Sequence, residues 1–258
     1  MAIIYSALQD KRSGITSSLW RYMSLSKLLQ MLESRTIWFT RVDRLIQADP
    51  FEGSIPLRYA LGAASEEQLE KDAAYEKRHN YAPGSLERTR AIRLMMHKTE
   101  RFRTFVSCWH ASQSDNDAMW RLYGSEKDGS VCVQTTAARA IKQLPDWVRI
   151  GRVNYKAYDR DVFSTDNCFS PFFHKRTCFS HENEVRFLIN PAVDTMDTPW
   201  NPDALGIPIP FEPDELLLKI CVSPASPHWF LGTVTTTVRR LGIRVSVEPA
   251  PMSMQPAF

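Results

Sequence analysis

The sequence predicts an α+β fold, with a central mixed or antiparallel sheet that is either continuous or split, flanking helices and a helical insertion. About seven short segments have strand-like patterns, and they alternate irregularly with helical segments. Ten glycines in 258 residues, with no glycine-rich phosphate loop, argue against a Rossmann or P-loop domain. A hydrophobic content of 43% and a charged content of 24% are typical of a globular protein with a sizeable core.

We expect one domain over residues 19–248, preceded by an arm (1–18) and followed by a tail (249–258). No apolar run is long enough to cross a membrane, and the first residues do not resemble a signal peptide. The five cysteines form no C-x-x-C pair, so we expect neither a zinc site nor a disulfide framework, and we expect a cytoplasmic protein. The net charge of +3 does not by itself imply nucleic acid.

The domain is expected to begin with a strand, a helix and a second strand. Residues 19–23 and 36–40 have strand patterns, and Ser24 is a good N-cap for the amphipathic helix between them. Asp49 and Glu52 follow the second strand in a turn-rich segment, which is a common location for binding groups. A structural turn, in which Asp49 caps backbone amides, is an equally good interpretation.

Residues 62–103 are expected to form an inserted helical hairpin, with the second helix starting at Ser85. From Ser85 to Arg103 there are six Lys or Arg residues against two Glu residues. This basic face could lie over phosphates, but most such runs are only solvated surfaces.

The second half of the domain continues the irregular alternation of strands and helices. The helices are expected at 117–123, 136–144 and 226–241, and the strands at 102–109, 130–134, 147–155, 216–222 and 243–247. Residues 191–214 are rich in proline and are expected to form a long surface loop.

The most informative stretch is Glu182-x-Glu184-x-Arg186, because its side chains alternate. On an extended strand, Glu182, Glu184 and Arg186 share one face, opposite an apolar face. Two carboxylates with Lys175 and Arg176 just upstream suit a sugar phosphate and the positive charge that can develop on it. A solvent-facing strand with a weak ion pair is the plainer interpretation.

Four stretches in this order resemble an uncharacterised bacterial family, the DUF2971-type domain found near phage-defence and mobile-element loci. The resemblance runs from about residue 19 to 248, covers the insertion poorly, and implies no established reaction. It would make the protein a toxin or phage-defence effector with an antitoxin or defence partner. The stretches are Trp20-Arg21-Tyr22 with Trp38-Phe39-Thr40, Asp49-Pro50-Phe51-Glu52-Gly53, Met119-Trp120-Arg121-Leu122-Tyr123-Gly124, and Lys175-Arg176 with the Glu-x-Glu-x-Arg motif.

A more distant resemblance is to the ADP-ribosyltransferase superfamily, whose members hold NAD in a split sheet. Arg21, Thr40 and Glu184 stand in the order of its three signature residues, with Glu182 as the first acid of the Glu-x-Glu pair. The middle strand lacks the superfamily's Ser-Thr-Ser motif. The resemblance implies NAD as the bound molecule, a protein, nucleic acid or small molecule as acceptor, and no metal.

The same resemblance assigns a role to each site residue. Glu184 would stabilise the oxocarbenium-like cation and Glu182 would orient the acceptor. Arg21 would hold a phosphate or ribose, because its planar fork suits bidentate contacts. Trp120 or Tyr123 could stack on nicotinamide, although such a Met/Trp/Tyr set is more often core. Arg186 would keep Glu184 ionised.

Two alternatives of other classes stay open. The aromatic and basic residues could form a non-catalytic sensor pocket for a nucleotide or an acidic partner. Alternatively, Asp49, Glu52, Glu182 and Glu184 could bind divalent metal in a nuclease. We expect one cavity to be lined by Arg21, Asp49, Glu52, Trp120, Tyr123, Lys175, Glu182, Glu184 and Arg186.

Overall fold

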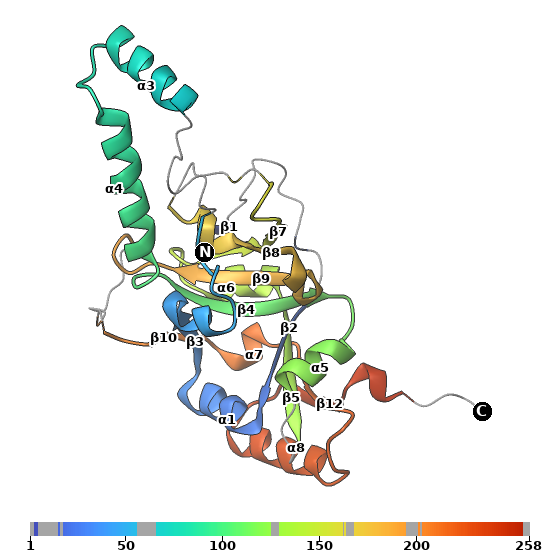
Figure 1. The fold of residues 1–258 in the computed structure, drawn as a ribbon. Helices are drawn as coiled ribbons and strands as arrows, with labels where there is room; N and C mark the ends of the chain where they lie inside the picture. Colours follow the sequence, from blue (N-terminus) through green and yellow to red (C-terminus); the bar gives the residue numbers. More distant parts are fainter. Residues whose placement is uncertain are drawn as a thin grey trace.

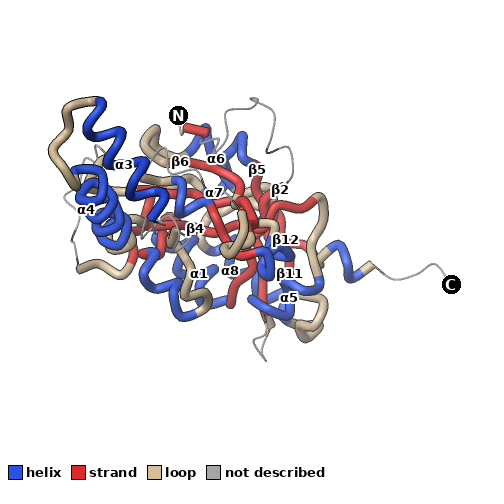
Figure 2. The backbone as a smooth tube through the Cα atoms, turned by 45° about the horizontal axis from the view of Figure 1, so that its top comes forward, coloured by secondary structure: helices blue, strands red, loops and turns tan. Residues whose placement is uncertain are grey.

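The computed structural model describes residues 3–4, 15, 18–55, 66–124, 129–161, 163, 168–194, 201 and 203–254. Its centre is a ten-stranded mixed sheet, which lies in the middle of the molecule with helices around it (Figures 1 and 2). The predicted α+β class is therefore confirmed. No helix in the described ranges is both long and apolar enough to cross a membrane.

The order of eight strands along the sheet is β1-β6-β9-β4-β2-β5-β11-β12. The pairs β1–β6 and β11–β12 are parallel, and the other pairs in the sheet are antiparallel. The bounds are β1 (Ile3–Ile4), β2 (Ser18–Ser24), β4 (Phe105–Ser112), β5 (Ser130–Thr136), β6 (Arg149–Arg152), β9 (Glu184–Ile189), β11 (Lys219–Val222) and β12 (Ser246–Pro249).

Two more strands extend from β4 and open the sheet: β3 (Thr36–Arg41) pairs with β4, and β10 (Gly206–Pro210) pairs with β3. One end of β4 pairs with β2 at residues 110–112, and the other end pairs with β3 at residues 105–106. Between them, Ser107–Trp109 pairs with β9 on one edge and with neither β2 nor β3 on the other. The sheet is therefore split along β4.

The two faces of the sheet have separate cores. Odd-numbered residues of β2, β4 and β9, such as Leu19, Trp109 and Phe187, pack in the largest apolar cluster with α1 (Leu25–Ser34) and α8 (Phe230–Arg240). Even-numbered residues face two smaller clusters, one around Trp20 and one around Phe172. This period of two is the alternation expected of strands.

Local capping explains where several helices begin. The Ser24 hydroxyl accepts a hydrogen bond from Lys27 N and starts α1. Asn116 and Thr136 cap α5 (Asp117–Tyr123) and α6 (Ala137–Gln143) in the same way. Each side chain satisfies a backbone N–H group that the helix leaves unpaired. These three starts agree with the sequence prediction.

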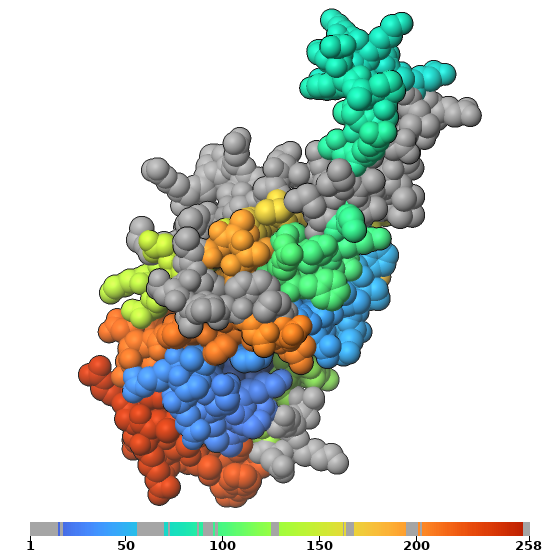
Figure 3. Space-filling model, turned by 90° about the vertical axis from the view of Figure 1, so that its left-hand side faces the viewer, coloured from blue at the N-terminus to red at the C-terminus, as the bar shows by residue number. Residues whose placement is uncertain are grey.

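The insertion contains two helices, α3 (Glu66–Arg78) and α4 (Ser85–Glu100), which project from the body (Figures 1 and 3). In the described part of the N-terminal arm, β1 pairs with β6. Residues 62–65, with which the predicted insertion begins, lie outside the described residues.

Three predictions about the second half are wrong. The segment 191–214 contains β10 and the start of α7 (Pro213–Leu216), so it is not only a loop. The predicted strand 147–155 is two strands, β6 and β7 (Asn154–Lys156), and β7 pairs with β8 (His174–Arg176) in a separate sheet. The last long helix begins at Phe230 instead of residue 226.

Glu182 is not on the strand with Glu184, which contradicts the single-strand prediction. It ends the 3-10 helix η3 (Thr177–Glu182), and Asn183 has a left-handed backbone with φ of 37°. Asparagine tolerates the left-handed region better than most residues other than glycine, because its short polar side chain can form hydrogen bonds nearby. Here its amide group donates to Ala111 O. Strand β9 starts only after this turn.

Candidate functional site

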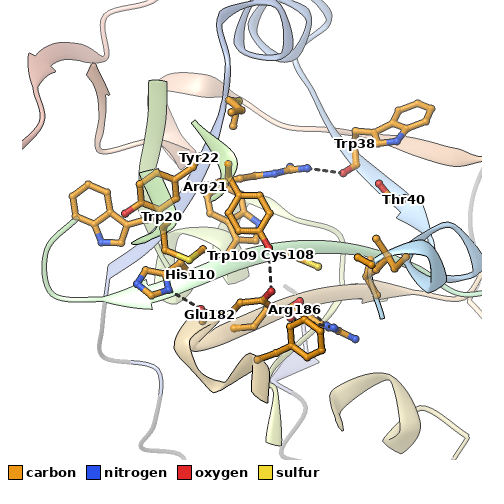
Figure 4. A pocket seen from close by; sticks show the side chains of 18 of the residues that line it. Trp20, Arg21, Tyr22, Trp38, Thr40, Cys108, Trp109, His110, Glu182 and Arg186 are labelled. Carbon is orange, nitrogen blue, oxygen red and sulfur yellow. Dashed lines mark hydrogen bonds and ion pairs between the residues drawn. The ribbon is translucent and has the colours of Figure 1, made fainter. Parts of the chain in front are cut away.

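A cavity of about 640 Å³ opens at the split in the sheet (Figure 4). Strands β2, β3, β4 and β9 line it, together with α1, α5, η3 and β8. Because the split interrupts the sheet, side chains from both faces reach the same space. Arg21 belongs to the face that carries the largest core, whereas Cys108, Glu184 and Arg186 belong to the opposite face.

Most of the sequence-predicted site residues line this cavity. They come from six separate places in the chain: Arg21, Thr40, Asp49, Glu52, Tyr123, Lys175, Glu182, Glu184 and Arg186. Two predicted residues do not line it, Trp120 and Arg176.

Trp120 is part of a core cluster. It is buried, its indole N–H donates to Asp115 Oδ2 at 3.1 Å, and its ring meets Tyr22 edge to face at 4.8 Å. A stacking role for Trp120 on a bound ring is therefore excluded by its packing. Tyr123, one helical turn further along α5, is half exposed and does line the cavity.

Arg176 contacts Asp49 but does not itself line the cavity. Its guanidinium contacts Asp49 Oδ1 at 2.9 Å and lies over the rings of Phe51 and Phe179. Asp49 Oδ1 also accepts the N–H of Phe51 at 3.0 Å, so the capping interpretation of this turn is confirmed. Phe51, which the sequence suggests is buried, is 42% exposed.

Arg21 carries a positive charge into the cavity without an acidic partner among the described residues. Its Nη2 donates to the carbonyl of Trp38 at 3.3 Å, and its guanidinium lies 5.8 Å from the Trp109 ring centroid (Figure 4). Burial lowers the pKa of Arg21, although its high intrinsic basicity keeps it charged. A desolvated, unpaired guanidinium is suited to bind an anion.

The opposite side of the cavity holds five charged groups that are bonded to one another, and we call them the charge network. In order along the bonds they are Glu52, Arg186, Glu184, Lys175 and Glu182. Arg186 is fully buried and forms forked contacts with both Glu52 and Glu184, and its Nη1 also donates to Phe172 O at 2.7 Å. Lys175 joins Glu184 at 3.4 Å and contacts Glu182.

The network fixes the ionisation of Glu184. Burial opposes the charged carboxylate, but Arg186 and then Lys175 outweigh that effect and hold the pKa of Glu184 at about 2. Burial lowers the pKa of Lys175, but Glu184, Glu182 and Glu52 outweigh that effect and raise it. Glu184 is therefore a permanent anion near neutral pH, which can stabilise a cation but cannot donate a proton.

Glu182 is held by a different set of bonds. The Tyr123 hydroxyl donates to Glu182 Oε1 at 3.1 Å, and Lys175 occupies Oε2. His110 Nδ1 lies 2.6 Å from the Glu182 backbone carbonyl; since a carbonyl only accepts, Nδ1 carries the proton. Glu182 thus reaches the cavity although it is off the strand.

Four further lining residues lie on β4, and the sequence did not mark them as functional: Val106, Cys108, Trp109 and His110. Burial and then Glu184 raise the pKa of Cys108, so its thiol stays protonated. The signal that could have found Cys108 and His110 is alternation, because both share a strand face with Val106. Which part of β4 lacks a neighbouring strand depends on pairing between segments that are far apart in the sequence. The local sequence pattern does not reveal that pairing.

Trp38 forms part of the rim and is 41% exposed. Its indole lies against Gly206 of β10: a Cβ there would come within 2.2 Å of Trp38 Cε2. Gly206 therefore allows Trp38 to lie flat over the neighbouring strand. This places an aromatic ring at the mouth of the cavity.

The four carboxylates that a metal nuclease would need are already bonded to cations. Asp49 contacts Arg176, and the three glutamates belong to the charge network. In the described ranges, no group of three or more His, Cys, Asp or Glu side chains is arranged to hold a metal ion. The geometry thus gives the nuclease alternative no positive support.

Comparison with known proteins finds no match to a family model, a curated protein or a solved structure. The function is therefore inferred from the cavity itself.

Proposed function

We propose that the cavity binds a nucleotide-type molecule, and that the protein cleaves the nicotinamide–ribose bond of NAD as an ADP-ribosyltransferase or NAD glycohydrolase. The observation that carries this proposal is that one cavity in a split sheet is lined both by Arg21, which has no acidic partner among the described residues, and by the buried, ionised Glu184. A cation for phosphate and an anion for a developing ribosyl cation are both needed by this chemistry.

In the proposed reaction, the C1′–N bond of NAD breaks and its electron pair goes to the nicotinamide nitrogen, which leaves as neutral nicotinamide. The positive charge moves to the ribose ring as an oxocarbenium-like cation, which Glu184 stabilises. Water or an acceptor hydroxyl then attacks C1′, and its proton is released to solvent. Glu182, held by Tyr123 and Lys175, orients that attacking group.

Arg21 holds the diphosphate in this proposal, and the aromatic rim stacks on the rings of the ligand. Trp38 and Tyr123 are exposed at the cavity and present flat surfaces for this purpose. Thr40 lies on β3 beside them and supplies a hydroxyl to the same wall. No step in this scheme needs a metal.

One observation favours a second candidate, a sensor module that binds a nucleotide without turnover. Both oxygens of Glu184 accept hydrogen bonds from Arg186, and Lys175 adds a third contact. These cations neutralise much of the charge that would stabilise the transition state. A role in phage defence, with an antitoxin or defence partner and a cytoplasmic setting, depends on the family resemblance and belongs to the same proposal.

The test is to incubate the purified protein with NAD and to measure free nicotinamide and any ADP-ribosylated product separately. Glu184→Gln keeps the shape of the side chain but removes its charge, so it should lower nicotinamide release by about 10²–10³-fold. Glu182→Gln should leave NAD cleavage nearly intact and impair transfer to an acceptor. Circular dichroism checks that each variant is folded.

The outcomes separate the two candidates. NAD binding without nicotinamide release would support the sensor module and reject the enzyme. Full NAD cleavage by a folded Glu184→Gln variant would also reject the proposed mechanism. Failure to bind NAD, ADP-ribose or ATP would reject both candidates.

A further inference from the structure

The tip of the α3–α4 hairpin carries three aromatic rings that pack on one another outside the core. The Tyr75 and His79 rings lie 4.2 Å apart with an interplanar angle of 31°, and Tyr81 lies 6.2 Å from Tyr75. Tyr75 is 49% exposed and Tyr81 is 53% exposed, and His79 is exposed as well. The rings form a continuous platform that adds little to the stability of the domain.

The backbone of the tip is held in place by one buried acid. The Glu76 carboxylate accepts hydrogen bonds from Gly84 N at 2.9 Å, from Leu86 N at 2.7 Å and from the Ser85 hydroxyl at 3.2 Å. Glu76 is 6% exposed, so its charge is used to cap α4 and is hidden from solvent. The platform is therefore pre-organised before any partner arrives.

Three cations lie near the platform along the chain: Lys77 and Arg78 in the last turn of α3, and Arg88 near the start of α4. All three are exposed, and none has an acidic partner in the part of the hairpin whose side chains the structure describes. The hairpin stands clear of the body (Figure 3), so a partner can reach these groups without meeting the sheet. Flat rings beside unpaired cations are complementary to bases and phosphates.

We propose that the hairpin tip docks single-stranded nucleic acid, with bases stacked on Tyr75, His79 and Tyr81 and phosphates beside Lys77, Arg78 and Arg88. Sequence-tolerant binding follows from this arrangement, because every base has a π-face and the tip offers few base-specific donors. The binding surface is separate from the cavity and does not depend on the proposed reaction there.

The test measures binding of a fluorescein-labelled oligothymidylate and of oligouridylate by fluorescence anisotropy. Tyr75→Ala/Tyr81→Ala should weaken binding by roughly tenfold or more, because two stacking surfaces are lost. Tyr75→Phe/Tyr81→Phe keeps both rings and should retain binding. Circular dichroism verifies the helical content of every variant.

Salt dependence provides the second measurement. Lys77→Ala/Arg78→Ala should lower the slope of log affinity against log salt by about 1.4, since each phosphate contact on a single strand contributes about 0.7. Arg239→Ala/Arg240→Ala removes the same charge from the exposed end of α8 and serves as the matched control. It should leave both the affinity and the slope unchanged.

Several outcomes would overturn the proposal. The unmodified protein could bind neither oligonucleotide even at low salt, or the tip variants could bind as well as the unmodified protein. Equal competition by polyglutamate would show a general preference for acidic polymers, and would assign the tip to an acidic protein partner instead.

Discussion

On the α1 side of the split sheet, Arg21 meets the cavity as a cation without an acidic partner among the described residues, whereas on the other side the charge network joins five groups. The network is buried and its bonds are largely satisfied, so it holds its members in fixed positions. Arg21 has only a carbonyl and an aromatic ring as neighbours. Arg186 therefore fixes the positions of two neighbouring acids, whereas Arg21 is available to a ligand.

This difference shows why the number of charged residues in a cavity is a poor guide to its ligand. A charge that is already neutralised cannot contribute much further attraction, and breaking its pair would leave a buried charge uncompensated. A charge without a partner can still attract a ligand group of opposite charge. We therefore expect the ligand's anion to lie at Arg21, and we expect changes in the network to affect stability in addition to the proposed reaction.

The largest effect is expected from Arg186→Met, which leaves Glu52 and Glu184 buried without their shared cation. Removing one partner of a buried ion pair costs about 3–5 kcal/mol of unfolding free energy. Urea denaturation followed by circular dichroism measures it. Adding Glu52→Gln and Glu184→Gln to Arg186→Met should recover a large part of the loss. A loss below about 1 kcal/mol for Arg186→Met would contradict the structural role of the network.

The next largest effect is expected from acid, which should weaken the charge network. Glu184 has a folded-state pKa of about 2, below its ordinary value of 4.5, so its stabilisation is complete above pH 4.5 and is lost as the pH falls toward 2. The contribution is on the order of 3 kcal/mol, from about 1.4 kcal/mol per pKa unit. Urea denaturation at a series of acidic pH values measures it, and Glu184→Gln should flatten the dependence. An unchanged dependence in that variant would assign the acid sensitivity to other groups.

Arg21→Met should affect binding much more than folding. The loss of a charge-assisted contact is worth about 1.5–3 kcal/mol, which is roughly 10- to 100-fold in affinity for an anionic ligand such as ADP-ribose. Stability should stay the same or rise, because a desolvated and unpaired cation is removed. Titration calorimetry and urea denaturation measure the two quantities. Lys27→Met, at an exposed lining position, is the control and should have a smaller effect.

The smallest effect is expected at an ion pair outside the cavity. Arg121 and Asp117 lie one turn apart on α5 at 2.8 Å, and both side chains are mostly exposed. Arg121→Ala should change the unfolding free energy by no more than about 0.5 kcal/mol, because solvent screens such pairs. The same urea denaturation applies. A larger loss would mean that distance alone, without burial, determines the strength of these pairs.

The elements that depend on neighbouring residues could be predicted from the sequence. Ser24, Asn116 and Thr136 cap the helices that follow them, and Glu184 shares a strand face with Arg186 as the alternation indicates. These features need only a few residues of context. Nine of the eleven site residues predicted from the sequence also line the cavity.

The sequence predictions that proved wrong involve contacts between segments that are far apart in the sequence. Glu182 leaves the strand because Asn183 turns the backbone and bonds to β4, and Trp120 is drawn into the core by Tyr22 and Asp115. The proline-rich segment was expected to be a loop, but β10 forms there as an edge strand that pairs with β3 alone in the described sheet. An edge strand tolerates Pro208 because one of its sides needs no N–H donors.

The open edge of β4 also provides a built-in reporter of occupancy. Peptide N–H groups within Ser107–Trp109 that point away from β9 have no described strand opposite them, and Cys108 and Trp109 line the cavity. In deuterium oxide, these protons should exchange quickly while the cavity holds only solvent. A bound molecule would slow their exchange, whereas the protons shared with β9 would exchange at the same rate as before. Mass-resolved deuterium uptake over β4 would therefore reveal a ligand even where no reaction occurs.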